Sequence, residues 1–115
     1  MDRYHTVKKN SDFANAIHTG KYAKNSCYSI YIVDNGLDRY RFGISVSKKL
    51  GNSVHRNLYK RQLRFIIDKY KKNYQNGKDY IIIIRKDYVD LDFSSKDELF
   101  MKLICKLNDF VAKEK

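Results

Sequence analysis

The amino-acid sequence predicts a small α+β fold in which helices cover one β-sheet. Residues 39–47 alternate between apolar and polar side chains, which is typical of a half-buried strand. Residues 79–86, DYIIIIRK, form an apolar run typical of a central buried strand. Two longer segments, 53–74 and the residues after 94 or 95, repeat apolar side chains at helical spacing. The chain has 115 residues, which is long enough for one core, so a single domain is expected over residues 1–115.

A short first helix is expected over residues 11–19. Ser11 is a plausible N-cap and Gly20 a plausible C-terminal stop for this helix. Phe13 and Ile17 are four residues apart, so they lie on one helix face. That face belongs either to the core or to an apolar surface open to a ligand.

Two strands joined by a turn follow. The first covers residues 26–33, and the Asn-Gly pair in the turn at 34–36 is a strong hairpin signal. Tyr31 differs in strand phase from Tyr28 and Ile30, so the two sets face opposite sides of the sheet, one core and one less buried. In the second strand, residues 39–47, the apolar face comprises Tyr40, Phe42, Ile44 and Val46.

The last helix is expected to begin near Ser94 or Ser95, after an acidic loop. Ser95 together with Glu98 fits a capping box. Its core face comprises Leu99, Phe100, Leu103, Ile104, Leu107, Phe110 and Val111. The expected order of elements is helix–strand–strand–helix–strand–helix (αββαβα), a small α/β sandwich.

The segment from Lys48 to Arg64 carries six basic residues and no acidic one. On the helix that starts near residue 53 or 54, a stripe about 140° wide at roughly 100° per residue comprises Arg56, Asn57, Lys60, Arg61 and Arg64. Like charges four residues apart repel by a few tenths of a kcal/mol per pair, and a polyanion would compensate this repulsion. We interpret this basic stripe as a nucleic-acid interface. The alternative is a solvated face without a partner, although such faces usually mix both signs.

The overall composition agrees with a polyanionic partner. Lys and Arg outnumber Asp and Glu by 24 to 13, which gives a formal net charge of +11. The sequence contains neither a long apolar run nor a signal-peptide pattern, and its two cysteines make no disulfide framework. We therefore expect a cytoplasmic protein. A membrane-surface role for the basic helix is disfavoured because the helix lacks a broad Leu/Phe/Trp face.

Other chemistry is weakly represented in the sequence. Phe13, Ile17 and Tyr31 are either core residues or a surface on which unpaired RNA bases stack. Asp87, Asp90 and Asp92 form the only carboxylate cluster. They are expected to complement the N-terminus of the last helix rather than to hold Mg²⁺. The histidines are isolated, so no metal site and no catalytic residue is predicted in this chain.

Three segments resemble the small protein subunit of bacterial ribonuclease P. The central segment, FGISVSKKLGNSVHRNLYKRQLR, is similar to the family signature, in which a strand ending in S-V-S-K-K precedes G-N-A-V and an R-N-R-x-K-R helix. The segment VKKNSDFANAIHTGK resembles the first helix of the family, and KDYIIIIRK resembles its buried last strand. The resemblance covers nearly the whole chain, in the same order.

The resemblance implies a fold of the ribosomal-protein S5 domain 2-like type. One mixed sheet would carry three helices, with a left-handed crossover around the basic helix, against the usual right-handed rule. The order would be αββαβα, or αβββαβα if a short extra strand forms near residues 22–24.

The resemblance also implies a function. In this family an RNA subunit with Mg²⁺, which that RNA mainly holds, removes the 5′ leader of precursor tRNA, and the protein binds both RNAs. By position, Lys48 and Lys49 flank the RNA-contacting helix, which carries Arg56, Asn57, Lys60, Arg61 and Arg64. The leader cleft would contain Phe13, Ile17 and Tyr31.

Three positions depart from the family pattern. Leu58 stands where the motif has an arginine, which removes one phosphate contact. Ile17 replaces a usual aromatic residue, and Phe65 stands where an acid is common. An isoleucine packs against a base but cannot stack on it as a ring does.

Two other classes of function remain open from the sequence. A ribosome-associated or assembly protein of the same fold would bind structured rRNA without any effect on a leader. A protein-only nuclease would cleave RNA alone and depend on Asp87, Asp90 or Asp92. The specific central motif disfavours the first class, and the lack of converging acids disfavours the second.

Overall fold

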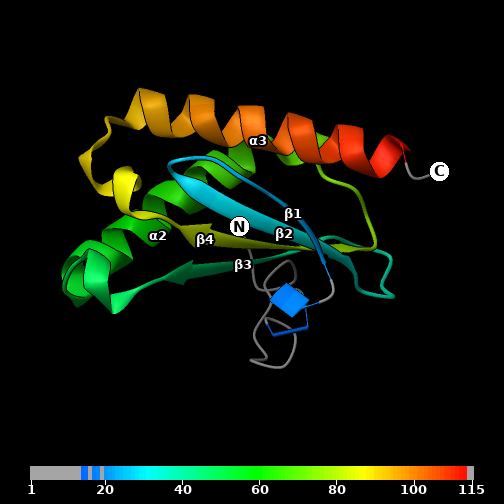
Figure 1. Cartoon of the computed structure of the whole chain (residues 1–115), viewed down its shortest axis with the longest axis horizontal. Helices are drawn as coiled ribbons and strands as arrows, with labels where there is room; N and C mark the ends of the chain where they lie inside the picture. The colour runs from blue at the N-terminus through cyan, green and yellow to red at the C-terminus, as the bar shows by residue number, and fades with distance from the viewer. Residues whose placement is uncertain (1–13, 16, 19, 114–115) are drawn as a thin grey trace.

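The computed structural model describes residues 14–15, 17–18 and 20–113 of the chain. Within the described residues, the elements with defined ends are four strands, two α-helices and three short 3₁₀ turns. Figure 1 shows how the strands and helices are arranged. In chain order these are β1 (Lys21–Lys24), β2 (Tyr28–Asp34), β3 (Arg41–Val46), η2 (Lys48–Leu50), α2 (Ser53–Lys69), η3 (Lys71–Asn73), β4 (Lys78–Ile84), η4 (Lys86–Asp90) and α3 (Phe93–Lys113).

The expected α+β class and mixed sheet are confirmed, with one strand more than the residue pattern alone predicted. β1 is the short strand near residues 22–24 that the family resemblance left open. Residues 14–15 and 17–18 are helical, and the rest of the expected helix over 11–19 lies outside the described residues. The count of three helices, the S5-like type and the left-handed crossover therefore stay predictions.

The sheet has the order β1-β2-β4-β3, so β4 is an inner strand and β3 an edge strand. β1 pairs with β2 and β2 with β4 in antiparallel fashion. β3 pairs with β4 in parallel, from Arg41 opposite Asp79 to Val46 opposite Ile84. A parallel pair cannot be closed by a tight hairpin, so the chain crosses over between β3 and β4 through α2.

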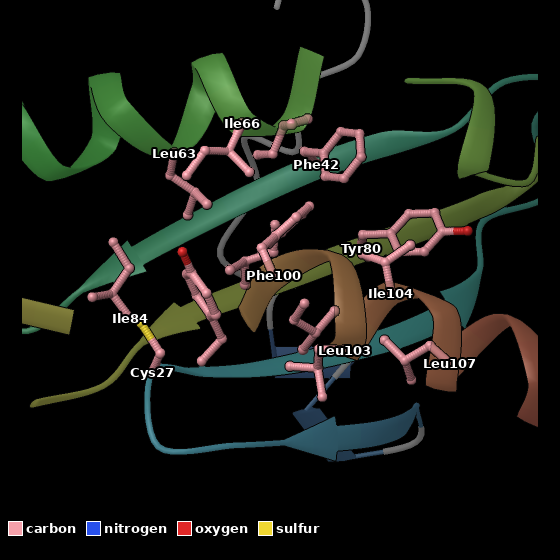
Figure 2. Close-up of a cluster of buried hydrophobic side chains, with 14 of the residues drawn as sticks. Cys27, Phe42, Leu63, Ile66, Tyr80, Ile84, Phe100, Leu103, Ile104 and Leu107 are labelled. Carbon is pink, nitrogen blue, oxygen red and sulfur yellow. The ribbon is translucent and has the colours of Figure 1, made fainter. Parts of the chain in front are cut away.

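Both helices cover the same face of this sheet, which we call the core face. Alternate residues of β2 point into the core, and the four central isoleucines of β4 contribute to both faces. Figure 2 shows α2 and α3 side chains meeting the sheet around Phe42, Tyr80 and Ile84. The helices contribute Tyr59, Leu63, Ile66, Ile67, Phe100, Leu103, Ile104 and Leu107. Among the described residues, the opposite face, which we call the open face, carries a small apolar cluster in which Tyr31 and Val33 pack on Ile81.

α2 begins close to its predicted start and ends before its predicted end. Asn52 is the N-cap, and its side chain accepts a hydrogen bond from the His55 N–H at 3.0 Å. The helix was expected to reach residue 74 but ends at Lys69 and continues as a 3₁₀ turn. The buried Tyr74 donates its hydroxyl proton to the Ile67 carbonyl at 2.9 Å, so a side chain satisfies a carbonyl near the helix end.

The predicted capping box of α3, Ser95 with Glu98, is wrong by one helical turn. The Asp92 carboxylate accepts from the Ser95 N–H at 3.0 Å, and α3 begins at Phe93. Hydrogen bonds from Ser95 lower the pKa of Asp92, because they favour its charged form. An acidic residue at this place also complements the helix dipole, as was expected of the carboxylate cluster. Neither α2 nor the described part of α3 combines the length and apolar character of a membrane-crossing helix.

One buried carboxylate ties the loop between β2 and β3 to β4. Asp79 is 3% exposed and accepts hydrogen bonds from Arg41 Nε at 2.8 Å and Nη2 at 2.6 Å. The Asn35 side chain donates to the same carboxylate at 2.9 Å. This pairing holds the first residues of β3 and β4 against each other, at the end of the sheet where the crossover returns to β4.

Replacing Asp79 by alanine should lower the free energy of unfolding by about 3 kcal/mol, because a poorly solvated arginine would lose its partner. Asp34→Ala is the matched control, since Asp34 pairs with Lys78 nearby but its side chain is 81% exposed. The control should cost less than about 1 kcal/mol. Urea denaturation measures both, and equal losses would contradict the role given to Asp79.

Candidate nucleic-acid interface

α2 presents three distinct sides, and the basic stripe occupies one of them. Tyr59, Leu63, Ile66 and Ile67 are buried against the sheet. Arg61, Arg64 and Asn57 are exposed, whereas Arg56 and Lys60 are half-buried beside the core side. The structure therefore brings all five members of the predicted stripe onto one continuous flank of α2.

The opposite flank of α2 faces α3. Gln62 accepts a hydrogen bond from the Tyr88 hydroxyl at 3.0 Å, and Lys69 forms an ion pair with Asp97 at 2.8 Å. These residues lie roughly 160° around the helix from the middle of the basic stripe, at 3.6 residues per turn. α2 packs over β3 while α3 packs over β1 and β2 (Figure 1). The basic stripe therefore lies on the side of α2 that is remote from α3, toward the β3 edge of the sheet.

The cations on the two flanks differ in their pairing. On the α3 side, Lys69 has its carboxylate partner, and the buried Lys96 lies over the Tyr88 ring at 4.3 Å and contacts Gln62. Burial lowers the pKa of Lys96, since it disfavours the charged form. The four cations of the basic stripe form no ion pair with any described residue. The Nε–H of Arg56 is buried and donates to no acceptor among those residues.

Lys48 and Lys49 extend this charged surface at the N-terminal end of α2. Both are exposed in η2, where Ser47 caps the turn by accepting from the Lys49 N–H at 3.2 Å. Gly51 has a φ of 150°, and a Cβ there would lie 3.0 Å from the His55 Cβ. This close approach keeps the two lysines next to the first turn of α2, which contains no acidic residue.

The predicted leader-cleft residues are only partly described. Tyr31 is half-buried on the open face of the sheet, whereas Tyr28, Ile30 and Ile32 of the same strand are core. The prediction of two differently buried strand faces is thus correct. Ile17 is 43% exposed. Phe13 lies outside the described residues.

The open face holds an aromatic residue that sequence reasoning missed. Tyr22 of β1 pairs with Tyr31 of β2, and their ring centroids are 5.3 Å apart. Tyr22 is 53% exposed. Its strand has only four residues, KYAK. An alternating pattern this short does not identify a strand in the sequence, so Tyr22 was not predicted to face Tyr31.

Leu58 and Phe65 are exposed on the far side of α2, as their positions opposite the apolar side suggested. Leu58 is 41% and Phe65 63% exposed. Phe65 lies beside Phe93, with ring centroids 5.8 Å apart. Phe93, Tyr70 and Met101 line an open groove of about 930 Å³ between the end of α2 and α3. Leu58 and Phe65 thus leave the basic stripe uninterrupted.

The carboxylates of the η4 region do not form a site with other ligand residues. Asp87 and Asp90 are exposed, and Asp92 caps α3. Within the described part of the chain, no three His, Cys, Asp or Glu side chains lie close enough together to hold a metal ion.

Comparisons with known proteins agree over almost the whole chain. A family model described as Ribonuclease P matches residues 1–108. The ribonuclease P protein component of Mycoplasma capricolum subsp. capricolum is 40% identical over 108 residues, which are 90% of this chain and 96% of the relative. That of Bacillus cereus is 37% identical over 105 residues, which are 90% and 89% of the two chains.

Solved structures give the same result for the fold. The RNase P protein of Staphylococcus aureus has a TM-score of 0.83 at 33% identity, covering 90% of this chain and 94% of that one. The RNase P protein of Thermotoga maritima has a TM-score of 0.79 at 29% identity, covering 86% and 94%.

Lys60→Gln should have opposite effects on stability and on polyanion binding. Lys60 lies four residues from both Arg56 and Arg64, and two like-charge pairs cost a few tenths of a kcal/mol each. At low salt the urea midpoint of the free protein should therefore rise slightly, while elution from heparin should move to lower salt. Lys86→Gln removes one exposed charge outside the stripe and should leave the midpoint unchanged. A lower midpoint with unchanged heparin elution would show that Lys60 serves packing alone.

Proposed function

The chain belongs to the bacterial ribonuclease P protein family, and we propose that it assists a catalytic RNA in removing the 5′ leader from precursor tRNA. Proteins of this family are subunits of a ribonucleoprotein that processes tRNA. The observation that carries the proposal is the segregation of unpaired cations onto one flank of α2, next to an open sheet face with exposed aromatic side chains. These are the two surfaces that a structured RNA and a single strand require.

The RNA subunit of ribonuclease P is the proposed ligand of the basic stripe. Arg56, Lys60, Arg61 and Arg64, with Lys48 and Lys49 at the helix start, offer cations that can replace the counterions of a phosphate backbone. Asn57 adds an uncharged donor in the same row. Since these cations have no carboxylate partner among the described residues, RNA phosphates would not have to displace one.

The 5′ leader of precursor tRNA is the proposed ligand of the open face. Tyr31 offers a half-exposed ring, and Ile17 an exposed aliphatic side chain, for contact with unpaired bases. Phe13 belongs to the same proposed cleft by its position in the family motif. Base stacking tolerates sequence variation, which suits a leader whose sequence differs from one precursor to the next. The leader contacts would raise the affinity for precursor over mature tRNA.

Bond cleavage is assigned to the RNA subunit, with Mg²⁺ held mainly by that RNA. This chain is proposed to supply no catalytic residue and to lower the Mg²⁺ requirement by offsetting repulsion between two polyanions. We also propose a cytoplasmic location, completion of the helix over residues 11–19 as a third helix, and a left-handed crossover of the S5-like type.

Reconstituted cleavage tests the proposed function directly. A 5′-labelled precursor tRNA is incubated at low Mg²⁺ with the protein alone, with a bacterial ribonuclease P RNA alone, and with both. Cleavage at the leader junction should be efficient only in the mixture. Cleavage by the protein alone would overturn the proposal, and no gain in the mixture would leave a general RNA-binding protein.

The gain in the mixture should depend on the basic stripe rather than on net charge. The triple variant Arg56→Ala/Lys60→Ala/Arg61→Ala should lose it. The control Lys71→Ala/Lys72→Ala/Lys102→Ala removes the same charge from exposed positions in η3 and α3 and should keep most of it. Equal losses in the two variants would assign the effect to the overall field of the protein.

A further inference from the structure

Tyr22 has a defined place beside the proposed leader surface. It lies on β1, directly opposite Tyr31 of β2, and antiparallel partners project their side chains to the same sheet face. The ring centroids are 5.3 Å apart and the ring planes are tilted by 31°. The two rings thus form one pair on the open face, away from α2 and α3.

The geometry of the pair leaves one ring free to receive a ligand. A base inserted between the rings would need roughly 7 Å, twice the 3.4 Å stacking step of nucleic acid. The observed separation excludes this arrangement. Tyr31 is half-buried against Ile81, whereas Tyr22 is 53% exposed at the sheet edge. A base would therefore stack on the outer side of Tyr22, with Tyr31 supporting the ring from behind.

Lys24 lies next to this ring on the same strand face. Residues two apart in a strand point to the same side, so Lys24 projects with Tyr22 and lies roughly 7 Å further along β1. It is exposed and forms no ion pair within the described part of the chain. A ring and a free ammonium group at this spacing match the base and the flanking phosphate of one extended nucleotide.

We propose that Tyr22 and Lys24 form an additional nucleotide-binding subsite for the unpaired leader, at the β1 edge of the open face. The inference rests on the proposed leader-binding function and deepens it. The Tyr22 ring supplies the base stacking that Ile17 cannot supply from the first helix. Lys24 contacts the adjoining phosphate, so the subsite selects single-stranded nucleic acid without selecting a base.

Binding of two tRNA substrates to the holoenzyme tests this subsite. One substrate carries a long unpaired leader, and the other is the same tRNA without a leader. Tyr22→Leu should weaken binding of the long-leader substrate by about fivefold or more, the loss expected when one stacking ring is removed. Binding of the leaderless tRNA should not change, and Tyr22→Phe should bind like the unaltered protein because it keeps the ring.

The charge of Lys24 is tested in the same holoenzyme. Lys24→Gln should reduce the slope of log affinity against log salt by about one for the long-leader substrate. Lys102→Gln is the matched control, since Lys102 lies on α3, across the sheet from the open face. The control should leave the slope unchanged.

The outcomes separate the subsite from the proposed function. If Tyr31→Leu weakens long-leader binding and Tyr22→Leu does not, the subsite is wrong and the leader surface stands. If Tyr22→Leu weakens both substrates equally, Tyr22 acts through the fold or the RNA subunit, and the subsite is again wrong. If the unaltered holoenzyme binds both substrates equally well, the leader contact itself fails.

Discussion

The parallel pairing of β3 with β4 is the constraint on which the arrangement of this protein depends. The register places Arg41 beside Asp79 at one end of the pair and Val46 beside Ile84 at the other. Because parallel neighbours need a long connection, the residues between them must leave one end of the sheet and return to the other. α2 makes that passage across the core face. The apolar side of α2 therefore packs on the sheet, and its other sides face α3 or solvent.

From this arrangement follow two surfaces with different chemistry, one on the flank of α2 toward the β3 edge and one on the open face over β1 and β2. On α2, contacts with α3 and η4 occupy one flank, and on the other the cations gather without a carboxylate partner among the described residues. On the sheet, α2 and α3 cover the core face, and on the second face Tyr22 is exposed and Tyr31 half-buried. A phosphate-rich RNA and an unpaired strand can thus be bound at once by a small domain, provided that each uses its own surface.

The sequence was sufficient to locate most helices and strands. It was insufficient where the apolar spacing of a helix continues beyond the residue at which the helix ends. Alternation located β2 and β3, and the isoleucine run located β4, because side-chain burial follows backbone period. Tyr70 and Tyr74 keep a helical spacing although α2 ends at Lys69, so the pattern could not mark the change to a 3₁₀ turn. The cap of α3 was misplaced because two acceptable capping residues lie one turn apart. The basic stripe on α2 could be predicted from the helical spacing of its residues. The pairing of Tyr22 with Tyr31 could not, because it depends on the register between β1 and β2.

The central claim is that the basic stripe and the open face contact different RNAs, and tethered cleavage tests it most directly. An iron chelate that generates hydroxyl radicals is attached to a single cysteine, introduced as Arg61→Cys or Ser29→Cys in a Cys105→Ser background; Cys27 is fully buried and would not react. In the holoenzyme bound to precursor tRNA, the position-61 chelate should cut the RNA subunit and the position-29 chelate should cut the leader. Cuts in the same RNA from both positions would contradict the account.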